Sequence, residues 1–207
     1  KLWREVKAAQ HQKGYQQAYR SMEAAAKDTE GEMLFYRSKV CEGVFHRISS
    51  GATRDGLEVF GKMEKGYLLS VDSNWDMYGE GYLSGHYFSE EALRKQLEKA
   101  YPGLVFTEES PEKQINMYKR DKVGHILSLT VGNETISGEE FRKLLELPSS
   151  NFTMQAADGK IRFLCKGQGH GLGLSQYGGN VLAKEGKSYR EILRYYFPEC
   201  EVKKEDS

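Results

Sequence analysis

The sequence predicts an α+β fold, with mixed and mostly antiparallel strands and several helices in a single domain. Helical and strand-like segments are interspersed without the regular strand–helix–strand period of a doubly wound protein. The 207 residues fit one domain of about 150–250 residues, and neither a linker nor an internal repeat divides them. Apolar residues make up 39% of the chain, which is enough for a hydrophobic core.

The first quarter of the chain predicts a helix followed by two strands. Apolar residues recur at helical spacing over residues 2–27, interrupted only by Gly14. Residues 32–36 have the composition of a strand, and residues 44–48 form a second one at about a hairpin's distance. A small, polar loop follows at residues 49–56.

The middle of the chain predicts a capped helix and a strand pair. Ser89 carries a capping signature for a helix that ends near Ala100, before a Tyr-Pro-Gly stop. Residues 108–120 are polar, and we expect them at the surface, within a possible insertion over about residues 86–120. Residues 124–131 alternate as a half-buried strand does, and residues 134–136 return after a Gly-Asn turn.

The last third predicts three helices and one hairpin. Ser137 caps a helix to Leu147, which Pro148 ends. The Asp158-Gly159 pair indicates a hairpin between residues 151–156 and 160–165. Two further helices are expected over the ranges 175–184 and 188–196.

Charge and composition exclude several classes of partner. The chain has 30 basic and 30 acidic residues, so a broad nucleic-acid footprint is not expected. No apolar run approaches the roughly 20 residues of a membrane span. The widely spaced Cys41, Cys165 and Cys200 do not support a zinc knuckle, and they allow either one disulfide plus a thiol or three thiols. No two histidines have HxH or HxxxH spacing, so a metal site would have to be assembled in space, and the sequence assigns no cofactor and no metal ligand.

A glycine-dense loop is the strongest local signal for a site. Within thirteen residues the loop holds six glycines, namely Gly167, Gly169, Gly171, Gly173, Gly178 and Gly179. So many glycines carry a large entropy cost, which indicates close backbone approach or positive φ. The spacing does not match a dinucleotide fingerprint, a P-loop or a serine nucleophile elbow.

Polar side chains in and after this loop are candidate ligand contacts. His170, Ser175, Gln176 and Tyr177 supply donors and acceptors beside the start of a helix. The simpler alternative is a tight strand-to-helix connection with Ser175 as an ordinary N-cap.

A second candidate wall comes from the end of the 44–48 strand. His46, Ser49, Ser50 and Thr53 place an imidazole and three hydroxyls at a polar loop, as a sugar- or peptide-binding cleft would require. The alternative is a structural turn with a surface histidine.

Together with their surroundings, these segments resemble the SpoIID family (stage II sporulation protein D and LytB-like domains). The family signature GxGHGxGMSQxGA corresponds to residues 167–179, with Leu174 in place of Met and Gly179 in place of Ala. Its FHxxSGGxT loop resembles residues 45–53, with Ala52 in the loop and Ser50 at the first glycine. The match continues through most of the chain in the same order.

The resemblance implies a peptidoglycan lytic transglycosylase of sporulation that acts on glycan strands without stem peptides. One Glu protonates the glycosidic oxygen, and its carboxylate then assists closure of a 1,6-anhydro ring, so a single carboxyl group serves in both roles. The family's Glu segment resembles EYLxGVVxxEMP, which has no counterpart in this sequence. We therefore expect an N-terminally truncated chain that holds the substrate cleft and is inactive alone, with its catalytic residue unknown.

For substrate binding the resemblance implies one groove between the two walls. Gly169, Gly171 and Gly173 would keep the loop close to the glycan, opposite the hydroxyl-bearing segment. His170 would bind sugar or orient the missing Glu. The expected location is extracytoplasmic, with membrane attachment only through an absent N-terminal anchor and possible partners in the sporulation cell-wall machinery. The alternatives are a non-catalytic amidase-enhancer or wall-binding module, and a structural subunit of a sporulation assembly.

Overall fold

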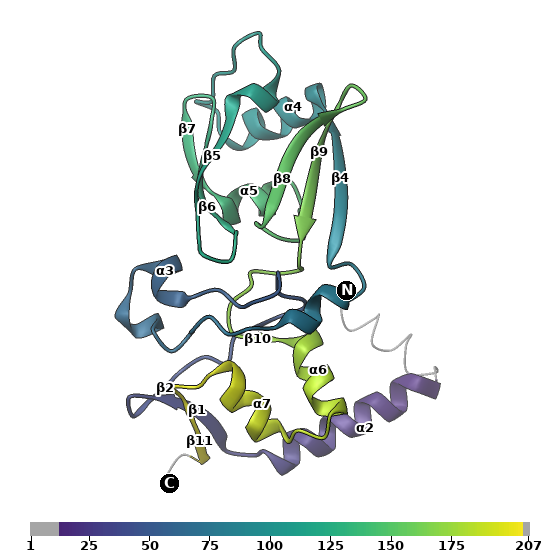
Figure 1. Ribbon diagram of the computed structural model, residues 1–207, viewed down its shortest axis with the longest axis vertical. Helices are drawn as coiled ribbons and strands as arrows, with labels where there is room; N and C mark the ends of the chain where they lie inside the picture. Colours follow the sequence, from purple (N-terminus) through teal and green to yellow (C-terminus); the bar gives the residue numbers. More distant parts are fainter. Residues whose placement is uncertain (1–12, 205–207) are drawn as a thin grey trace. The chain divides into compact units, whose positions relative to one another are not determined.

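The computed structural model describes residues 13–204 (Figure 1). The chain divides into two compact units, residues 1–41 with 201–207 and residues 42–200. Helices alternate with small, mostly antiparallel sheets in the described residues, and the predicted α+β class is confirmed.

The described residues of the first unit form one helix and a three-stranded sheet. The helix α2 spans Lys13–Asp28, and the part predicted over residues 2–12 lies outside the described residues. Strand β1 (Glu32–Tyr36) pairs antiparallel with both β2 (Lys39–Val40) and β11 (Glu201–Lys204). The expected hairpin between residues 32–36 and 44–48 is wrong, because the chain reverses earlier, at Arg37 and Ser38, which both have positive φ.

Two three-stranded antiparallel sheets form one end of the second unit. One has the order β4–β9–β8, with bounds Leu83–Ser89, Lys160–Lys166 and Phe152–Ala157. The other has the order β5–β6–β7, with bounds Ile115–Arg120, Ile126–Val131 and Glu134–Ser137. The predicted Asp-Gly hairpin is confirmed: Asp158 and Gly159 have φ of 51° and 70° between β8 and β9.

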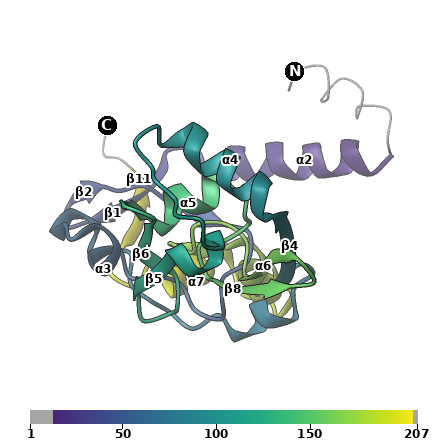
Figure 2. The same cartoon turned by 90° about the horizontal axis from the view of Figure 1, so that it is seen from above.

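Two helices close the core between these sheets. Helix α4 (Glu90–Ala100) begins at the predicted cap Ser89, and α5 (Gly138–Leu144) begins with a capping box of Ser137 and Glu140. Figures 1 and 2 show the two sheets on either side of α5. Aromatic rings pack at the centre, among them Phe141, Phe152 and Phe163. Helix α5 ends at Leu144, three residues before the predicted end.

The polar segment over residues 108–120 is not a surface loop. It forms the short helix η3 (Pro111–Gln114) and strand β5, which pairs with β6. Ile115 is buried in the core with the side chains of α4. Most residues of the segment are exposed, as expected, although Pro111 and Ile115 are buried. An insertion relative to other proteins stays a prediction.

The remaining elements of the second unit surround the glycine-dense loop. Short strands β3 (Phe45–His46) and β10 (Leu174–Ser175) pair in parallel. Helices α6 (Gln176–Lys184) and α7 (Tyr189–Tyr196) start at the N-caps Ser175 and Ser188, as predicted. The segment between β3 and β4 contains α3, η1 and η2, with bounds Gly56–Phe60, Met63–Lys65 and Asn74–Tyr78. Among residues 13–204, each helix is too short or too polar to cross a bilayer.

Candidate functional site

The two walls predicted from the sequence lie directly against each other. The backbones of residues 44–54 and 167–177 exchange hydrogen bonds along their length. Gln168 and Ile48 bond reciprocally, with N···O distances of 2.7 and 3.1 Å, and the Arg54 N–H donates to the Gly171 carbonyl at 2.8 Å. The two segments are therefore brought together, but as one packed ribbon and not as opposite sides of a groove.

This close packing explains the alternating glycines. Gly171 and Gly173 have φ of 76° and 68°, in the left-handed region that favours glycine. A methyl group at Gly171 would lie 2.9 Å from Arg54 Cδ and 3.0 Å from His125 Nε2. At Gly173 it would overlap the Val44 carbonyl oxygen. The glycines thus allow the close approach of backbone segments that their number predicts. At Gly171 and Gly173 the groups that approach are other parts of the protein.

His46 is buried at the centre of the ribbon, with 3% of its surface exposed. Its Nδ1–H donates to the Leu172 carbonyl at 3.0 Å, and its Nε2 is buried without a hydrogen-bond partner among the described residues. Burial lowers the pKa of His46 to about 4, although the bond to Leu172 opposes this and His170 adds to it. The ring is therefore neutral at neutral pH.

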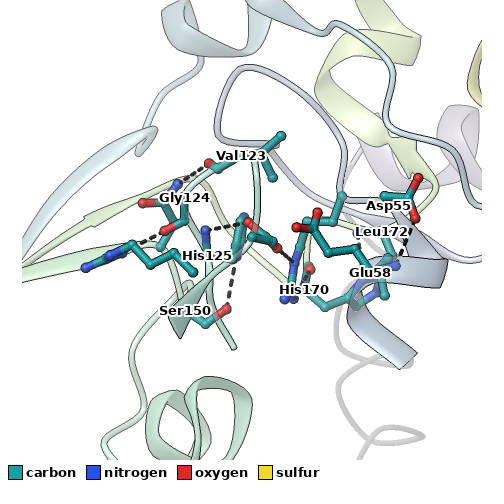
Figure 3. Close-up of polar contacts among 12 residues, drawn as sticks. Asp55, Glu58, Val123, Gly124, His125, Ser150, His170 and Leu172 are labelled. Atoms are coloured by element: carbon teal, nitrogen blue, oxygen red, sulfur yellow. Dashed lines mark hydrogen bonds and ion pairs between the residues drawn. The ribbon is translucent and has the colours of Figure 1, made fainter. Parts of the chain in front are cut away.

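His170 lies beside His46 and reaches a cavity. The two ring centroids are 5.8 Å apart, and the half-buried His170 accepts the Leu172 N–H at Nδ1, 3.1 Å away (Figure 3). The neutral ring therefore carries its proton on Nε2. Burial lowers the pKa of His170 most, whereas the carboxylate of Glu139 and a backbone bond with Phe45 raise it.

A third histidine, which the sequence analysis did not single out, completes the cluster. His125 is buried between two hydroxyls. Ser150 Oγ lies 3.0 Å from its Nδ1 (Figure 3), and Ser50 Oγ lies 3.3 Å from its Nε2. Burial, followed by the charge of Arg54, lowers its pKa well below the usual value. We refer to His46, His125 and His170 as the histidine cluster. At neutral pH it offers neutral donors and acceptors and no charge.

A buried ion pair fixes the cluster to the β5–β6 turn. Arg54 Nε donates to Asp121 Oδ2 at 2.5 Å, and both side chains are almost completely buried. Arg54 Nη1 also donates to the His170 carbonyl at 3.1 Å, and Asp121 Oδ1 accepts the His125 N–H at 2.8 Å. The pair therefore positions the backbones that carry two of the three histidines.

Most of the predicted hydroxyls are used inside the protein. Thr53 Oγ1 is buried, donating to the Leu69 carbonyl at 3.1 Å and accepting the Val71 N–H at 2.9 Å. Ser49 Oγ accepts the Gly51 N–H, and Ser175 Oγ accepts the Gly178 N–H. These hydroxyls stabilise turns and a helix start, which agrees with the simpler interpretation of Ser175 as an N-cap.

The remaining candidate residues separate into two cavities. Gln176 and Tyr177 line an open cavity of about 570 Å³ with Arg47, Glu80 and Asn180. His170 lines a different cavity, of about 470 Å³, whose lining also includes Arg54, Leu172 and residues of α5. Gly169 belongs to neither lining, and its N–H donates to the Pro148 carbonyl at 2.8 Å. His170 is thus the one predicted side chain that joins the histidine cluster to a cavity.

Two side chains of this smaller cavity were missed from the sequence. Glu139 and Lys143 lie one turn apart on α5 and both line it. Their only sequence signal is a capped amphipathic helix, which does not indicate a ligand site. Among residues 13–204, no three His, Cys, Asp or Glu side chains come together as a metal site would require.

Cys165 has a structural environment. It is buried in the core of the β4–β9–β8 sheet, where burial raises the pKa of the thiol to about 12. A thiol in this state is a poor nucleophile, so it does not contribute a reactive group.

The fold and site together define an α+β protein with a neutral, hydrogen-bonding histidine cluster open to one cavity. The chain matches no protein-family model. It is 30% identical over 202 residues to stage II sporulation protein D of Bacillus amyloliquefaciens, and 27% identical over 194 residues to that of Bacillus subtilis (strain 168). Each match covers 93% of this chain and 54% of the relative. The chain belongs to the SpoIID family and spans about half the length of these relatives.

A shorter similarity concerns a protein with a different name. Over 50 residues the chain is 42% identical to the amidase enhancer of Bacillus subtilis (strain 168). This match covers 24% of the chain and 7% of the relative.

Proposed function

We propose that this chain binds the glycan strands of peptidoglycan as the substrate-binding part of a sporulation lytic transglycosylase. The observation that carries the proposal is the histidine cluster, whose half-buried member His170 lines a cavity of about 470 Å³. Small-molecule sites commonly have volumes of about 300–1,000 Å³. Neutral imidazoles suit a glycan because sugar hydroxyls and N-acetyl groups are themselves neutral donors and acceptors.

The catalytic step in this proposal requires a carboxyl group outside the histidine cluster. The family's general-acid segment has no counterpart in the 207 residues, so we assign glycan positioning and not proton transfer to this chain. The work would take place outside the cytoplasm, in contact with the sporulation cell-wall machinery. The similarity to stage II sporulation protein D supports the sporulation and cell-wall context of this proposal.

Co-sedimentation tests glycan binding. The 207-residue chain is incubated with glycan strands stripped of stem peptides and, in parallel, with intact sacculi, and the pelleted fraction is measured. We expect stronger binding to stripped strands and a several-fold loss with His170→Ala. The matched control is His86→Ala, because His86 lies on β4 and bonds Ser84 instead of lining the cavity. Equal binding by both variants would refute the role of His170, and no binding by the unsubstituted chain would refute the proposal.

Product analysis tests the division of roles. Stripped strands incubated with the 207-residue chain alone are expected to yield no 1,6-anhydro ends by mass spectrometry. If the chain alone produces them, and His170→Ala abolishes the product, the general acid lies within these residues and the proposed division is wrong.

The amidase-enhancer similarity favours a second candidate function. In that case the chain would bind the wall and stimulate a separate amidase without any contribution to glycan cleavage. The two candidates differ in a mixing experiment. If the second candidate function is right, adding the chain should raise the activity of a purified cell-wall amidase. If the first is right, the amidase activity should not change.

A further inference from the structure

The backbone of Leu172 is held by two histidine side chains. Its N–H donates to Nδ1 of His170 at 3.1 Å, and its carbonyl accepts the Nδ1–H of His46 at 3.0 Å. The two bonds respond differently to acid. His46 can gain a proton at Nε2 and keep its bond, because its Nδ1 already donates, whereas His170 accepts through the lone pair of Nδ1. The bond from the Leu172 N–H therefore exists only while His170 is neutral.

Protonation of His170 would set two donors against each other. A charged imidazole has an N–H on both nitrogens and no acceptor, so its Nδ1–H would face the Leu172 N–H. Turning the ring would not restore the bond, because neither nitrogen then has a free lone pair. The turn of residues 170–172 therefore cannot keep its present form once His170 is charged.

The segment of residues 170–173 can move without disturbing its ends. The N–H groups of Gly169 and Leu174 donate to carbonyls outside the loop, at 2.8 and 3.0 Å, and anchor the two sides. Between these anchors lie Gly171 and Gly173, which have positive φ. Glycine adopts both signs of φ at little cost, so the segment has other conformations available.

Positive charge already lies close to the His170 ring. Arg54 Nη1 donates to the His170 carbonyl at 3.1 Å, and the charges of Arg54 and Arg142 both disfavour a second cation here. The carboxylate of Glu139 opposes them, but its Oε1 already accepts two bonds from Arg142. The elements around the turn carry further titratable or charged side chains, namely His46 on β3, Asp55 and Glu58 at α3, Asp121, Lys122 and His125 between β5 and β6, and Glu140 and Lys143 on α5.

We propose that His170 and Leu172 form an acid-sensitive latch, in which protonation of His170 breaks its bond to the Leu172 N–H and releases residues 170–173 from Arg54. Two bonds from Arg54 would be lost on release, one from its N–H to the Gly171 carbonyl and one from Nη1 to the His170 carbonyl. Because His170 and Leu172 both line the cavity of about 470 Å³, release would also displace part of the cavity wall.

The direction of the response follows from the surroundings of the ring. Burial holds the pKa of His170 below its usual value of 6.5. The latch is therefore closed at neutral pH, and it opens as the pH falls through the lowered pKa. The inference requires no glycan and goes beyond the proposed function.

Amide hydrogen exchange followed by NMR tests the latch in the 207-residue chain without any ligand. Protection factors, which correct for the pH dependence of the exchange chemistry, would be measured from pH 7.5 to 4.5 while the imidazole signals report the titration of His170. We expect the protection of the Leu172 and Arg54 amides to fall about tenfold as His170 gains its proton, as loss of a hydrogen bond provides. The Phe163 amide should stay protected, because Phe163 lies in the central strand β9 and is paired on both sides.

A conservative variant separates the titration from the bond. In His170→Asn the side-chain carbonyl can accept an N–H two residues further along the chain, and it does not titrate. The Leu172 and Arg54 amides of this variant should therefore stay protected over the whole pH range. The matched control His86→Asn on β4 should keep the original pH dependence.

Three results would overturn the latch. The first is unchanged protection of the Leu172 amide while His170 titrates. The second is a fall at Leu172 without one at Arg54, which would mean that the bond breaks and the segment stays in place. The third is an equal fall at Phe163, or a fall of the same size in His170→Asn, which would mean that the whole fold and not the latch responds to acid.

Discussion

Two adjacent glycines of α6 should respond oppositely to the same substitution. A methyl group at Gly178 would lie 2.6 Å from Ser73 Oγ and would overlap the Tyr196 hydroxyl and Trp75 Nε1. At Gly179 its nearest neighbours would be Ile192 Cγ2 and a Leu174 methyl, both at an ordinary 3.6 Å. Neither position has positive φ, so steric environment alone distinguishes them.

The magnitudes follow from helix propensity and packing. Replacing Gly by Ala within a helix stabilises it by about 0.5–1 kcal/mol, which is the whole expected effect at Gly179. At Gly178 overpacking costs about 1–3 kcal/mol. Displacing the buried Ser73–Tyr196 hydrogen bond, 2.9 Å long, adds about 1 kcal/mol. We expect Gly178→Ala to lower the free energy of unfolding by about 2 kcal/mol and Gly179→Ala to raise it slightly.

Thermal unfolding followed by circular dichroism measures this difference. For a chain of this size 1 kcal/mol shifts the Tm by about 2–4 °C, so the two variants should differ by about 5–10 °C. If Gly178→Ala is as stable as Gly179→Ala, the close packing of α6 against Tyr196 and Trp75 is wrong.

Two further predictions concern buried titratable and charged side chains. The unfolded chain protonates His46 near pH 6.5 but the folded protein only near pH 4, so acidification between these values favours unfolding, by up to about 3 kcal/mol at pH 4. Urea titrations at pH 7 and 4.5 should show this loss of unfolding free energy, and His46→Gln should reduce it. If the loss between the two pH values is the same in His46→Gln, His46 titrates normally and the prediction is wrong. Asp121→Ala leaves Arg54 buried without its partner and should lower the free energy of unfolding by about 3–5 kcal/mol. Adding Arg54→Met should recover part of this loss, and a double variant whose loss equals the sum of the two single losses would contradict the pairing.

Local signals in the sequence accounted for most of the elements. The capping serines Ser89, Ser137 and Ser188 each begin a helix, because their hydroxyls accept N–H groups that would otherwise lack partners. Asp158-Gly159 forms the predicted hairpin, since both residues adopt positive φ. Strand β11 was missed because its polar residues show no alternation, and its pairing with β1 joins distant parts of the chain.

The site was predictable in position but only partly in detail. Six glycines indicated close backbone approach, and the loop does pack against residues 44–54. The sequence does not show which hydroxyls the backbone uses, so Thr53 and Ser175 were assigned to a ligand although both are internal. His125 and Glu139 were missed because they enter the site through contacts between segments far apart in the chain.

Histidine NMR during a glycan titration tests the central claim most directly. The imidazole signals of the 207-residue chain would be followed as stripped strands are added. We predict that the His170 signals shift in a saturable way, because its ring reaches the cavity, while those of His86 on β4 stay in place. If strands bind and His170 does not respond, the glycan lies elsewhere on the protein and the account of the site is contradicted.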